Sequence, residues 1–234
     1  MLGDFMEYKI IGNNMQNLRI TLEEGEKVYA DSGKLISKSL NTVMTPRMAG
    51  GIMQAIEREV TGASALLTEF TSKEGPGDVS VGGVFPGKVY IVDLKDGQQF
   101  AAEDYAFLAA EDTVKFSIQP VNIGAAFFGG AGLVLQRFIG PGKVFIHVVG
   151  DIVEYDLDGT NTVEIDPGHI AGFDEGLSYK IRFVDNIRTA MFGGVGLFLA
   201  TFSGKGRLIV HSVSRLKLSA EMFAAGAQAY KGKK

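Results

Sequence analysis

Cysteine is absent from the sequence of 234 residues. Its absence excludes disulfide bonds, thiolate zinc sites, iron–sulfur clusters and a cysteine nucleophile. Long hydrophobic runs are absent too, because the longest apolar stretch, residues 123–135, spans only 13 residues and contains four glycines. A helix that crosses a membrane needs roughly 20 apolar residues. The N-terminus contains Asp4 and Glu7 and has no apolar signal-peptide core. We therefore expect a cytoplasmic protein with no transmembrane segment.

Sequence motifs of common enzymes are also lacking. Neither Gly-x-Ser-x-Gly nor His-Glu-x-x-His occurs. Residues 82–88 match the Gly-x-x-x-x-Gly-Lys pattern of phosphate-binding loops, but Val89 follows where magnesium binding needs serine or threonine. Residues 89–92 predict a strand rather than the helix N-terminus that would hold phosphate. We predict no catalytic residues, no cofactor and no enzymatic activity.

Charge of one sign is only slightly in excess, since the formal net charge is −4. This mild acidity argues against a surface dedicated to nucleic acid. Glycine, in contrast, is abundant: 31 of 234 residues, against a usual share of ~7%. The glycines follow no collagen period, and many lie in turn sequences such as those around Gly97 and Gly159. An all-β fold with many turns accounts for them best.

An internal repeat organises the chain. Residues 130–142 and 194–206 share the pattern Gly-x-Gly-Leu-x-Leu-x-x-Phe-x-Gly-x-Gly, and each copy is followed by a histidine, His147 or His211. A weaker copy occupies residues 62–70. Repetition at a fixed offset indicates that one structural unit has been copied within the chain.

A second signature precedes each copy. It consists of a leucine, an apolar residue six positions later, an acidic residue three further on and an apolar residue four beyond that. It occupies residues 22–35, 94–107 and 157–170. We predict a single compact domain, 1–234, with units at 7–85, 86–150 and 151–214 and a C-terminal helix and tail at 215–234.

Each unit is predicted to be a β sandwich. Residues 18–22 and 114–118 alternate apolar and polar side chains, which is typical of half-buried strands. Pairing with a neighbouring unit would cover the open sheet edges of each unit. Two helices are expected outside this pattern, one inserted near 46–60 and one near 219–230.

The repeated motifs resemble the altered-inheritance-of-mitochondria protein 24 family, over about residues 7–225. The resemblance implies three units per chain that are similar to the β sandwich of the trp RNA-binding attenuation protein, and assembly into homotrimeric rings. The eukaryotic relative is associated with organisation of the mitochondrial inner membrane. The resemblance supplies no catalytic residues. Ser64 and Ala65 depart from the glycine and leucine of the motif, which weakens exact threefold symmetry.

Two of the three histidines, His147 and His211, occupy equivalent repeat positions, and the matching residue in the first unit is Gly82. A symmetric three-histidine metal site would need a histidine there, so we predict no metal site within one chain. A homotrimer could still gather three copies of one histidine on its axis.

Two apolar segments precede the strongest motif copies. They are Ala-Ala-Phe-Phe-Gly-Gly at 125–130 and Ala-Met-Phe-Gly-Gly at 190–194. Such segments can close the core, form a subunit interface or contact lipid or peptide. The sequence leaves these three roles open.

The leading hypothesis is therefore a non-enzymatic, self-associating β scaffold that binds an unknown protein complex or a membrane surface. One alternative is an RNA-binding ring, by analogy of fold alone, which the net charge weakens. The other alternative is an enzyme or metal protein that uses His147, His211 and neighbouring Asp or Glu.

Overall fold

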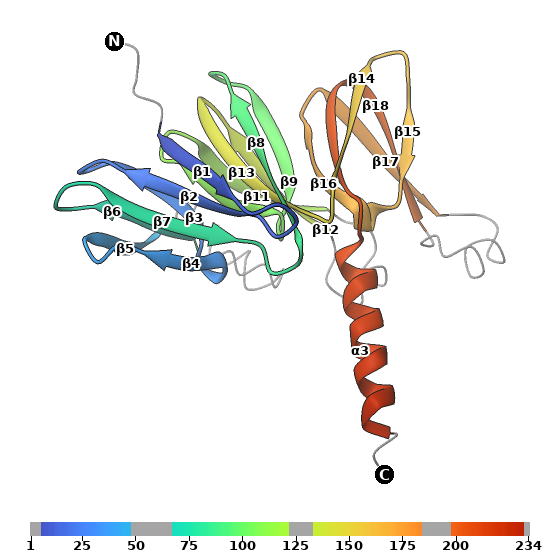
Figure 1. Ribbon diagram of the computed structural model, residues 1–234. Coiled ribbons are helices and arrows are strands. Elements are labelled where there is room, and N and C mark those ends of the chain that lie inside the picture. The colour runs from blue at the N-terminus through green and yellow to red at the C-terminus, as the bar shows by residue number, and fades with distance from the viewer. Residues whose placement is uncertain (1–5, 48–66, 122–132, 184–197, 232–234) are drawn as a thin grey trace.

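A computed structural model describes residues 6–47, 67–121, 133–183 and 198–231 of the chain (Figure 1). Within these ranges the fold is all-β apart from two short 3₁₀ turns and one C-terminal helix, α3, Arg215–Lys231. The predicted fold class and the C-terminal helix are thus confirmed. The helix begins at Arg215 rather than Ser219, and Ser214 accepts a hydrogen bond from the backbone N–H of Lys217 at 3.5 Å. None of the described helices is long and apolar enough to cross a membrane.

The strands fall into three consecutive sets. The first contains β1 Glu7–Ile11, β2 Asn17–Leu22, β3 Lys27–Asp31, β4 Leu35–Lys38, β5 Thr42–Arg47, β6 Leu67–Ser72 and β7 Gly77–Gly82. The second contains β8 Gly87–Leu94, β9 Gln99–Glu103, β10 Phe107–Glu111, β11 Lys115–Val121, β12 Leu133–Ile139 and β13 Gly142–Val149. The third contains β14 Ile152–Asp158, β15 Val163–Ile165, β16 Ile170–Asp174, β17 Leu177–Phe183 and the long β18 Phe198–His211.

The same pairing scheme recurs in each set. In the first, β7 lies between β2 and β4, and β6 lies between β5 and β3. In the second, β13 lies between β8 and β10, and β12 between β11 and β9. In the third, the single strand β18 takes both places, pairing with β14 and β16 through its second half and with β17 and β15 through its first half.

Registers and bulges match across the sets as well. Phe70, Phe138 and Phe202 are fully buried and lie opposite equivalent residues of β3, β9 and β15. A register shift interrupts β4, β10 and β16 at the same position of each strand. The phenylalanine of the repeated motif therefore fills the same core position three times.

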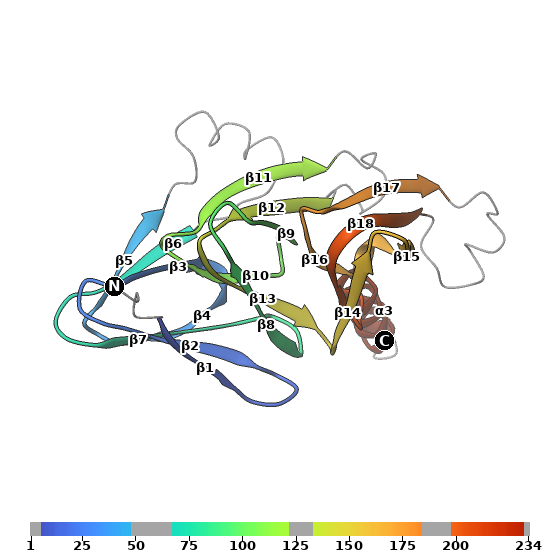
Figure 2. The same cartoon turned by 90° about the horizontal axis from the view of Figure 1, so that it is seen from above.

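Neighbouring sets are joined edge to edge. β3 pairs antiparallel with β10, and β9 pairs antiparallel with β16. As a result, one six-stranded sheet contains strands of the first and second sets, and one eight-stranded sheet contains strands of the second and third. Figure 2 shows the three sets side by side, with β5, β11 and β17 along one side. These shared sheets provide the edge protection that the repeat predicted.

The helix expected near 46–60 does not begin at residue 46. Pro46 and Arg47 are the last residues of β5, opposite Thr68 and Leu67 of β6. β5 is an edge strand of its sheet, and proline is tolerated at an edge because it has no N–H to offer a second neighbour. The rest of the expected helix, from residue 48, lies outside the described residues.

Candidate functional site

The two junctions between sets use one register. Ala109, Ala110 and Glu111 of β10 lie opposite Ala30, Tyr29 and Val28 of β3. At the second junction, Gly172, Phe173 and Asp174 of β16 lie opposite Ala102, Ala101 and Phe100 of β9. Both junctions are therefore built from an equivalent of β3 and an equivalent of β4.

One equivalent of each kind remains without such a partner among the described residues. Of the described strands, β4 is hydrogen-bonded to β7 and ends its sheet, and β15 pairs with β18 alone. β4 of the first set and β15 of the last set are therefore equivalent to the two strands that pair at each internal junction.

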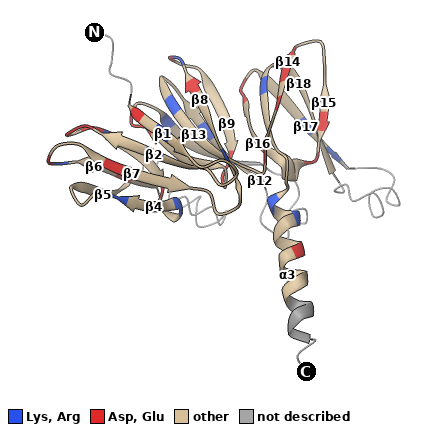
Figure 3. Cartoon of the chain, viewed as in Figure 1, with Lys and Arg blue, Asp and Glu red and all other residues tan. Residues whose placement is uncertain are grey.

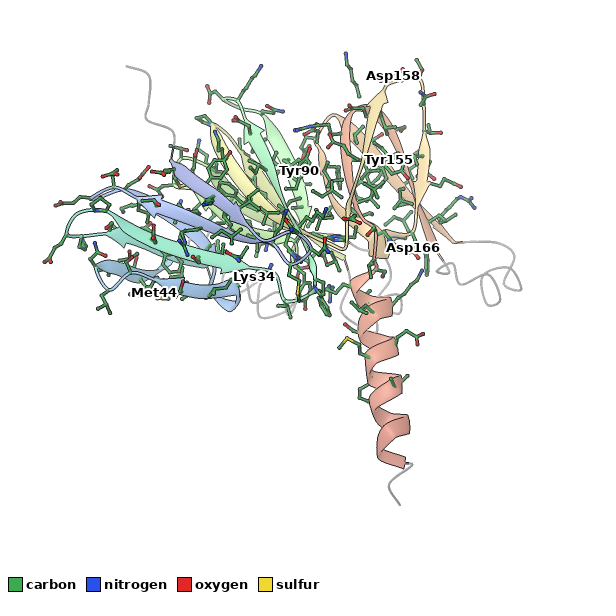
Figure 4. The ribbon with its side chains drawn as sticks, in the orientation of Figure 1. Lys34, Met44, Tyr90, Tyr155, Asp158 and Asp166 are labelled. Carbon is green, nitrogen blue, oxygen red and sulfur yellow. The ribbon has the colours of Figure 1, made fainter. Side chains whose placement is uncertain are left out.

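Exposure of side chains marks β4 as an incomplete junction. Ile36 is 59% exposed, whereas its equivalents Leu108 and Ala171 are both 0% exposed. The β4–β5 hairpin exposes three further large apolar side chains, Leu40, Val43 and Met44, the last of which is labelled in Figure 4. A group of exposed apolar side chains is typical of a protein interface.

The two equivalent histidines lie near the ends of β13 and β18. His147 lies opposite Val89 and His211 opposite Ile152, while Gly82 takes the same place opposite Asn17 in the first set. Both histidines are buried. The ring of His147 packs against two glycines, because a Cβ on Gly83 would lie 2.3 Å from it and one on Gly87 2.7 Å from its Nε2.

The structure brings both histidines to one small cavity, which the symmetry of the sequence repeat did not predict. The cavity has a volume of about 110 Å³ and lies where the three sets and the start of α3 meet. Its lining residues are Lys34, Val84, Phe85, Glu103, Tyr105, His147, Val149, His211 and Arg215. We refer to it as the junction cavity.

Lys34 ties the first set to the second at this cavity. Its Nζ donates to the carbonyl oxygens of Tyr105 and Phe107, both at 2.5 Å, and lies 3.5 Å from Oδ2 of Asp31. Figure 4 shows its position at the underside of the first set. Burial, as the largest cause, lowers the pKa of Lys34 below its ordinary value, although Asp31 opposes this shift.

Arg215, the first residue of α3, ties the helix to the second set. Its Nη2 donates to Oε1 of Glu103 at 3.1 Å, and its guanidinium lies over the ring of Tyr105, 3.7 Å from the ring centroid. Two residues further along, Lys217 pairs with Asp166 at 2.8 Å. Basic side chains thus gather at the first turn of α3, while Asp166 lies beside it (Figures 3 and 4).

Burial shifts the protonation of the groups around the cavity. Burial, followed by the charge of Asp104, raises the pKa of Glu103 to about 7, and burial raises that of Asp104 to about 6. Burial lowers the pKa of His147 to about 4 and that of His211 to about 3. Both histidines are therefore neutral near pH 7. The backbone N–H of Val149 donates to Nδ1 of His211 at 3.0 Å, so the proton of this neutral ring is on Nε2.

Among the described residues, no group of three or more His, Cys, Asp or Glu side chains is arranged to hold a metal ion. The strand predicted at the end of the phosphate-loop-like segment is confirmed, because Lys88 is the second residue of strand β8 rather than part of a helix N-terminus. The apolar segments 125–130 and 190–194 lie outside the described residues.

The family model for mitochondrial biogenesis AIM24 matches residues 8–213 of this chain. The chain belongs to the AIM24 family. This confirms the resemblance drawn from the repeated glycine and leucine motif. An uncharacterized protein of Streptococcus pyogenes serotype M6 is 28% identical over 221 residues, which covers 91% of this chain and 86% of the relative.

The architecture is also similar to a solved structure. A crystal structure of a Streptococcus pyogenes protein from a structural genomics consortium aligns with a TM-score of 0.75 and 26% sequence identity. The alignment covers 96% of this chain and 99% of that protein. The name of neither relative describes an activity.

Sequence reasoning missed Lys34, Glu103 and Arg215 as members of one site. The only signal was the acidic residue of the second signature, which is Asp31, Glu103 or Asp166 in the three sets. Each of these acids has a basic partner, Lys34, Arg215 and Lys217 respectively. No spacing in the sequence shows that the partners of the last two come from the C-terminal helix.

Proposed function

We propose that this member of the AIM24 family is a non-enzymatic scaffold that assembles with itself through β4 and β15. β15 of one copy adds to β4 of the next, in the way that β3 adds to β10 and β9 to β16 within the chain. The observation that carries the proposal is the exposure of Ile36, whose two equivalents are fully buried at the internal junctions.

The internal junctions also give the register of the proposed contact. Transfer of the β3–β10 and β9–β16 registers to the new pair places Ser37 opposite Ile165, Lys38 opposite Glu164 and Ser39 opposite Val163. The central pair has opposite charges, and opposite charges on facing residues stabilise antiparallel strands. Burial of the exposed 59% of Ile36 contributes roughly 1–2 kcal/mol.

A head-to-tail contact of this kind forms a ring if its rotation closes. We propose a homotrimer, in which three chains would place nine equivalent strand sets around one axis. An unknown protein complex or a membrane surface is the expected partner of this assembly. The mild acidity of the chain, −4, argues against the alternative partner, RNA.

Size-exclusion chromatography with light scattering tests the proposal. The wild-type protein is expected at about three times the 25.1 kDa of one chain. Ile36→Glu places a charge inside the junction and is expected to reduce the mass to that of one chain. Met15→Glu, at a residue 70% exposed between β1 and β2, is the matched control and should leave the assembly intact.

Two results would count against self-assembly through these edges. One is a wild-type mass of a single chain throughout the micromolar range. The other is an assembly that survives Ile36→Glu with unchanged mass, since a charge on a buried junction residue cannot be tolerated without a partner.

A further inference from the structure

The junction cavity has a mostly apolar wall, and the charged side chains in it already have partners. Lys34 uses its Nζ for two backbone carbonyl oxygens and for the carboxylate of Asp31. Arg215 is paired with Glu103. A charged occupant would meet no unbalanced opposite charge here, so the cost of removing it from water would not be offset. The cavity therefore suits an uncharged occupant.

His211 places one unpartnered polar atom in this wall. The residue is 4% exposed, and its Nδ1 accepts from the backbone N–H of Val149 at 3.0 Å. The ring is therefore neutral, with its proton on Nε2. No group among the described residues accepts a hydrogen bond from this Nε2–H. A buried donor of this kind is destabilising until an acceptor reaches it.

His147, the other histidine of the lining, mainly fills space. It is 3% exposed, and glycine backbone covers its ring. A Cβ on Gly83 would lie 2.3 Å from its Nδ1, and a Cβ on Gly87 would lie 2.7 Å from its Nε2. The Nε2–H of His211 is consequently the polar anchor that the cavity offers to an occupant.

The volume of the cavity limits the size of that occupant. It is about 110 Å³, whereas an apolar protein cavity of about 150 Å³ accommodates benzene. About four or five heavy atoms therefore fit. Water suits the cavity poorly, because a buried water molecule needs about two to four polar partners, and this wall presents one unpartnered donor among mostly apolar groups.

We propose that the junction cavity binds a small uncharged carbonyl compound, such as a short-chain ketone or aldehyde. Its oxygen accepts a hydrogen bond from Nε2 of His211, and its alkyl part lies against Val84, Phe85 and Val149, which form the apolar wall. A carbonyl oxygen supplies the missing acceptor and brings no N–H or O–H that would stay unpaired against this wall.

Nuclear magnetic resonance of the imidazole nitrogens tests the site in the full-length protein, which has three histidines. Acetone is the probe. Isobutene has the same skeleton without the oxygen, and acetate has the same shape with a negative charge. The expected result near pH 7 is a saturable shift of the Nε2 signal of His211 with millimolar acetone and none with acetate. The signal of His169, which lies outside the lining, should move less.

His211→Asn tests the proposed hydrogen bond. Asparagine keeps an acceptor for the N–H of Val149 at the place of Nδ1 but has no donor at the place of Nε2. Ligand-observed resonance then measures the affinities for acetone and isobutene in wild type and variant. The affinity for acetone relative to isobutene should fall about fivefold in the variant, as expected for the loss of one hydrogen bond.

Val149→Ile tests the volume independently of the histidine. The added methyl group enters the cavity, so the affinities for acetone and isobutene should both fall at least threefold. Val153→Ile adds the same group to a half-buried residue of β14 outside the lining and should change neither affinity more than twofold. This pair of variants also serves if His211→Asn fails to fold.

The proposal is overturned if acetone gives no saturable shift, which is the result for a cavity that holds only water, or if acetate binds as tightly as acetone. An unchanged ratio of acetone to isobutene affinity in His211→Asn would also contradict it. Failure here is separate from failure of self-assembly. The cavity lies within one chain, and Ile36→Glu, outside the lining, should bind acetone as wild type does.

Discussion

Oε1 of Glu103 accepts a hydrogen bond from Nη2 of Arg215 at 3.1 Å, so a strand of the second set holds the first residue of the C-terminal helix. The carboxylate is buried, and the charge of Arg215 does not fully offset the cost of removing it from water. Because the pKa of Glu103 is about 7, this carboxyl group gains or loses its proton near neutral pH, which changes the charge in its contact with Arg215.

Replacement of Glu103 by glutamine is expected to stabilise the protein at high pH. The folded-state pKa of about 7 lies above the ordinary 4.5, so the contribution of Glu103 to stability is fully present below pH 4.5 and is lost as the pH rises through 7. Glutamine keeps the shape of the neutral acid. Urea unfolding should show Glu103→Gln more stable than wild type by about 1–2 kcal/mol near pH 8, and nearly equal near pH 5. A variant that is less stable than wild type at both pH values would show that the ion pair outweighs the cost of burial.

Replacement of His211 by asparagine should make the protein less sensitive to acid. The folded-state pKa of about 3 lies below the ordinary 6.5, so the stability contributed by the neutral ring is present above pH 6.5 and is lost as the pH falls toward 3. The loss amounts to about 1.4 kcal/mol per pH unit. Asparagine can still accept from the N–H of Val149 and does not titrate. Unfolding free energies near pH 6 and pH 5 should differ less in His211→Asn than in wild type. The same substitution at His169, outside the cavity lining, is the control, and an equal effect there would contradict the assignment.

The repeat could be predicted from the sequence because it lies in residues whose roles are local. Phe138 and Phe202 occupy the same place in the repeated motif, and each fills the core opposite a residue of the neighbouring strand in its own set. The pattern of turns and alternating strands follows from the same local rules. The contacts between sets could not be predicted in this way, because Lys34 binds backbone carbonyls of Tyr105 and Phe107, which any sequence would supply.

The junction cavity is a second feature that the sequence repeat could not predict. The sequence repeat predicts equivalent places for His147, His211 and Gly82, related by symmetry. In the structure the two histidines line one asymmetric space, and a residue of α3 completes it. A helix that has no counterpart in the repeat breaks its symmetry, and the repeat alone gives no information on where that helix lies.

Gly87 in the phosphate-loop-like segment is predicted to be needed for close packing rather than for phosphate. A Cβ at this position would lie 2.2 Å from the carbonyl oxygen of Val148 and 2.7 Å from Nε2 of His147. Because the nearer atom belongs to the backbone, the strands must move apart, and Gly87→Ala should destabilise the fold by about 1–3 kcal/mol. Gly226→Ala, in α3 with nothing within 4 Å of the added Cβ, should instead stabilise by up to about 1 kcal/mol. Urea unfolding of both variants checks this, and equal stabilities would argue against the close approach.

Exchange of charges across the proposed β4–β15 contact tests its register directly. Lys38→Glu alone would place two carboxylates opposite each other, the introduced one on one copy and that of Glu164 on the next. Like charges on facing residues destabilise paired strands, and opposite charges stabilise them by about 0.2–1 kcal/mol. Assembly should therefore weaken in Lys38→Glu and also in Glu164→Lys, and should recover in part in the double variant.

Some loss of assembly will persist in every one of these variants, because Lys38 donates to the carbonyls of Ser39 and Thr42, and Glu164 pairs with Arg182. The decisive quantity is consequently the coupling between the two substitutions, measured from dimer and trimer populations by sedimentation velocity. A shift of one residue along β15 would put Lys38 opposite Val163 or Ile165, where the two substitutions would show no coupling. Recovery in the double variant therefore supports only the register found at the two internal junctions.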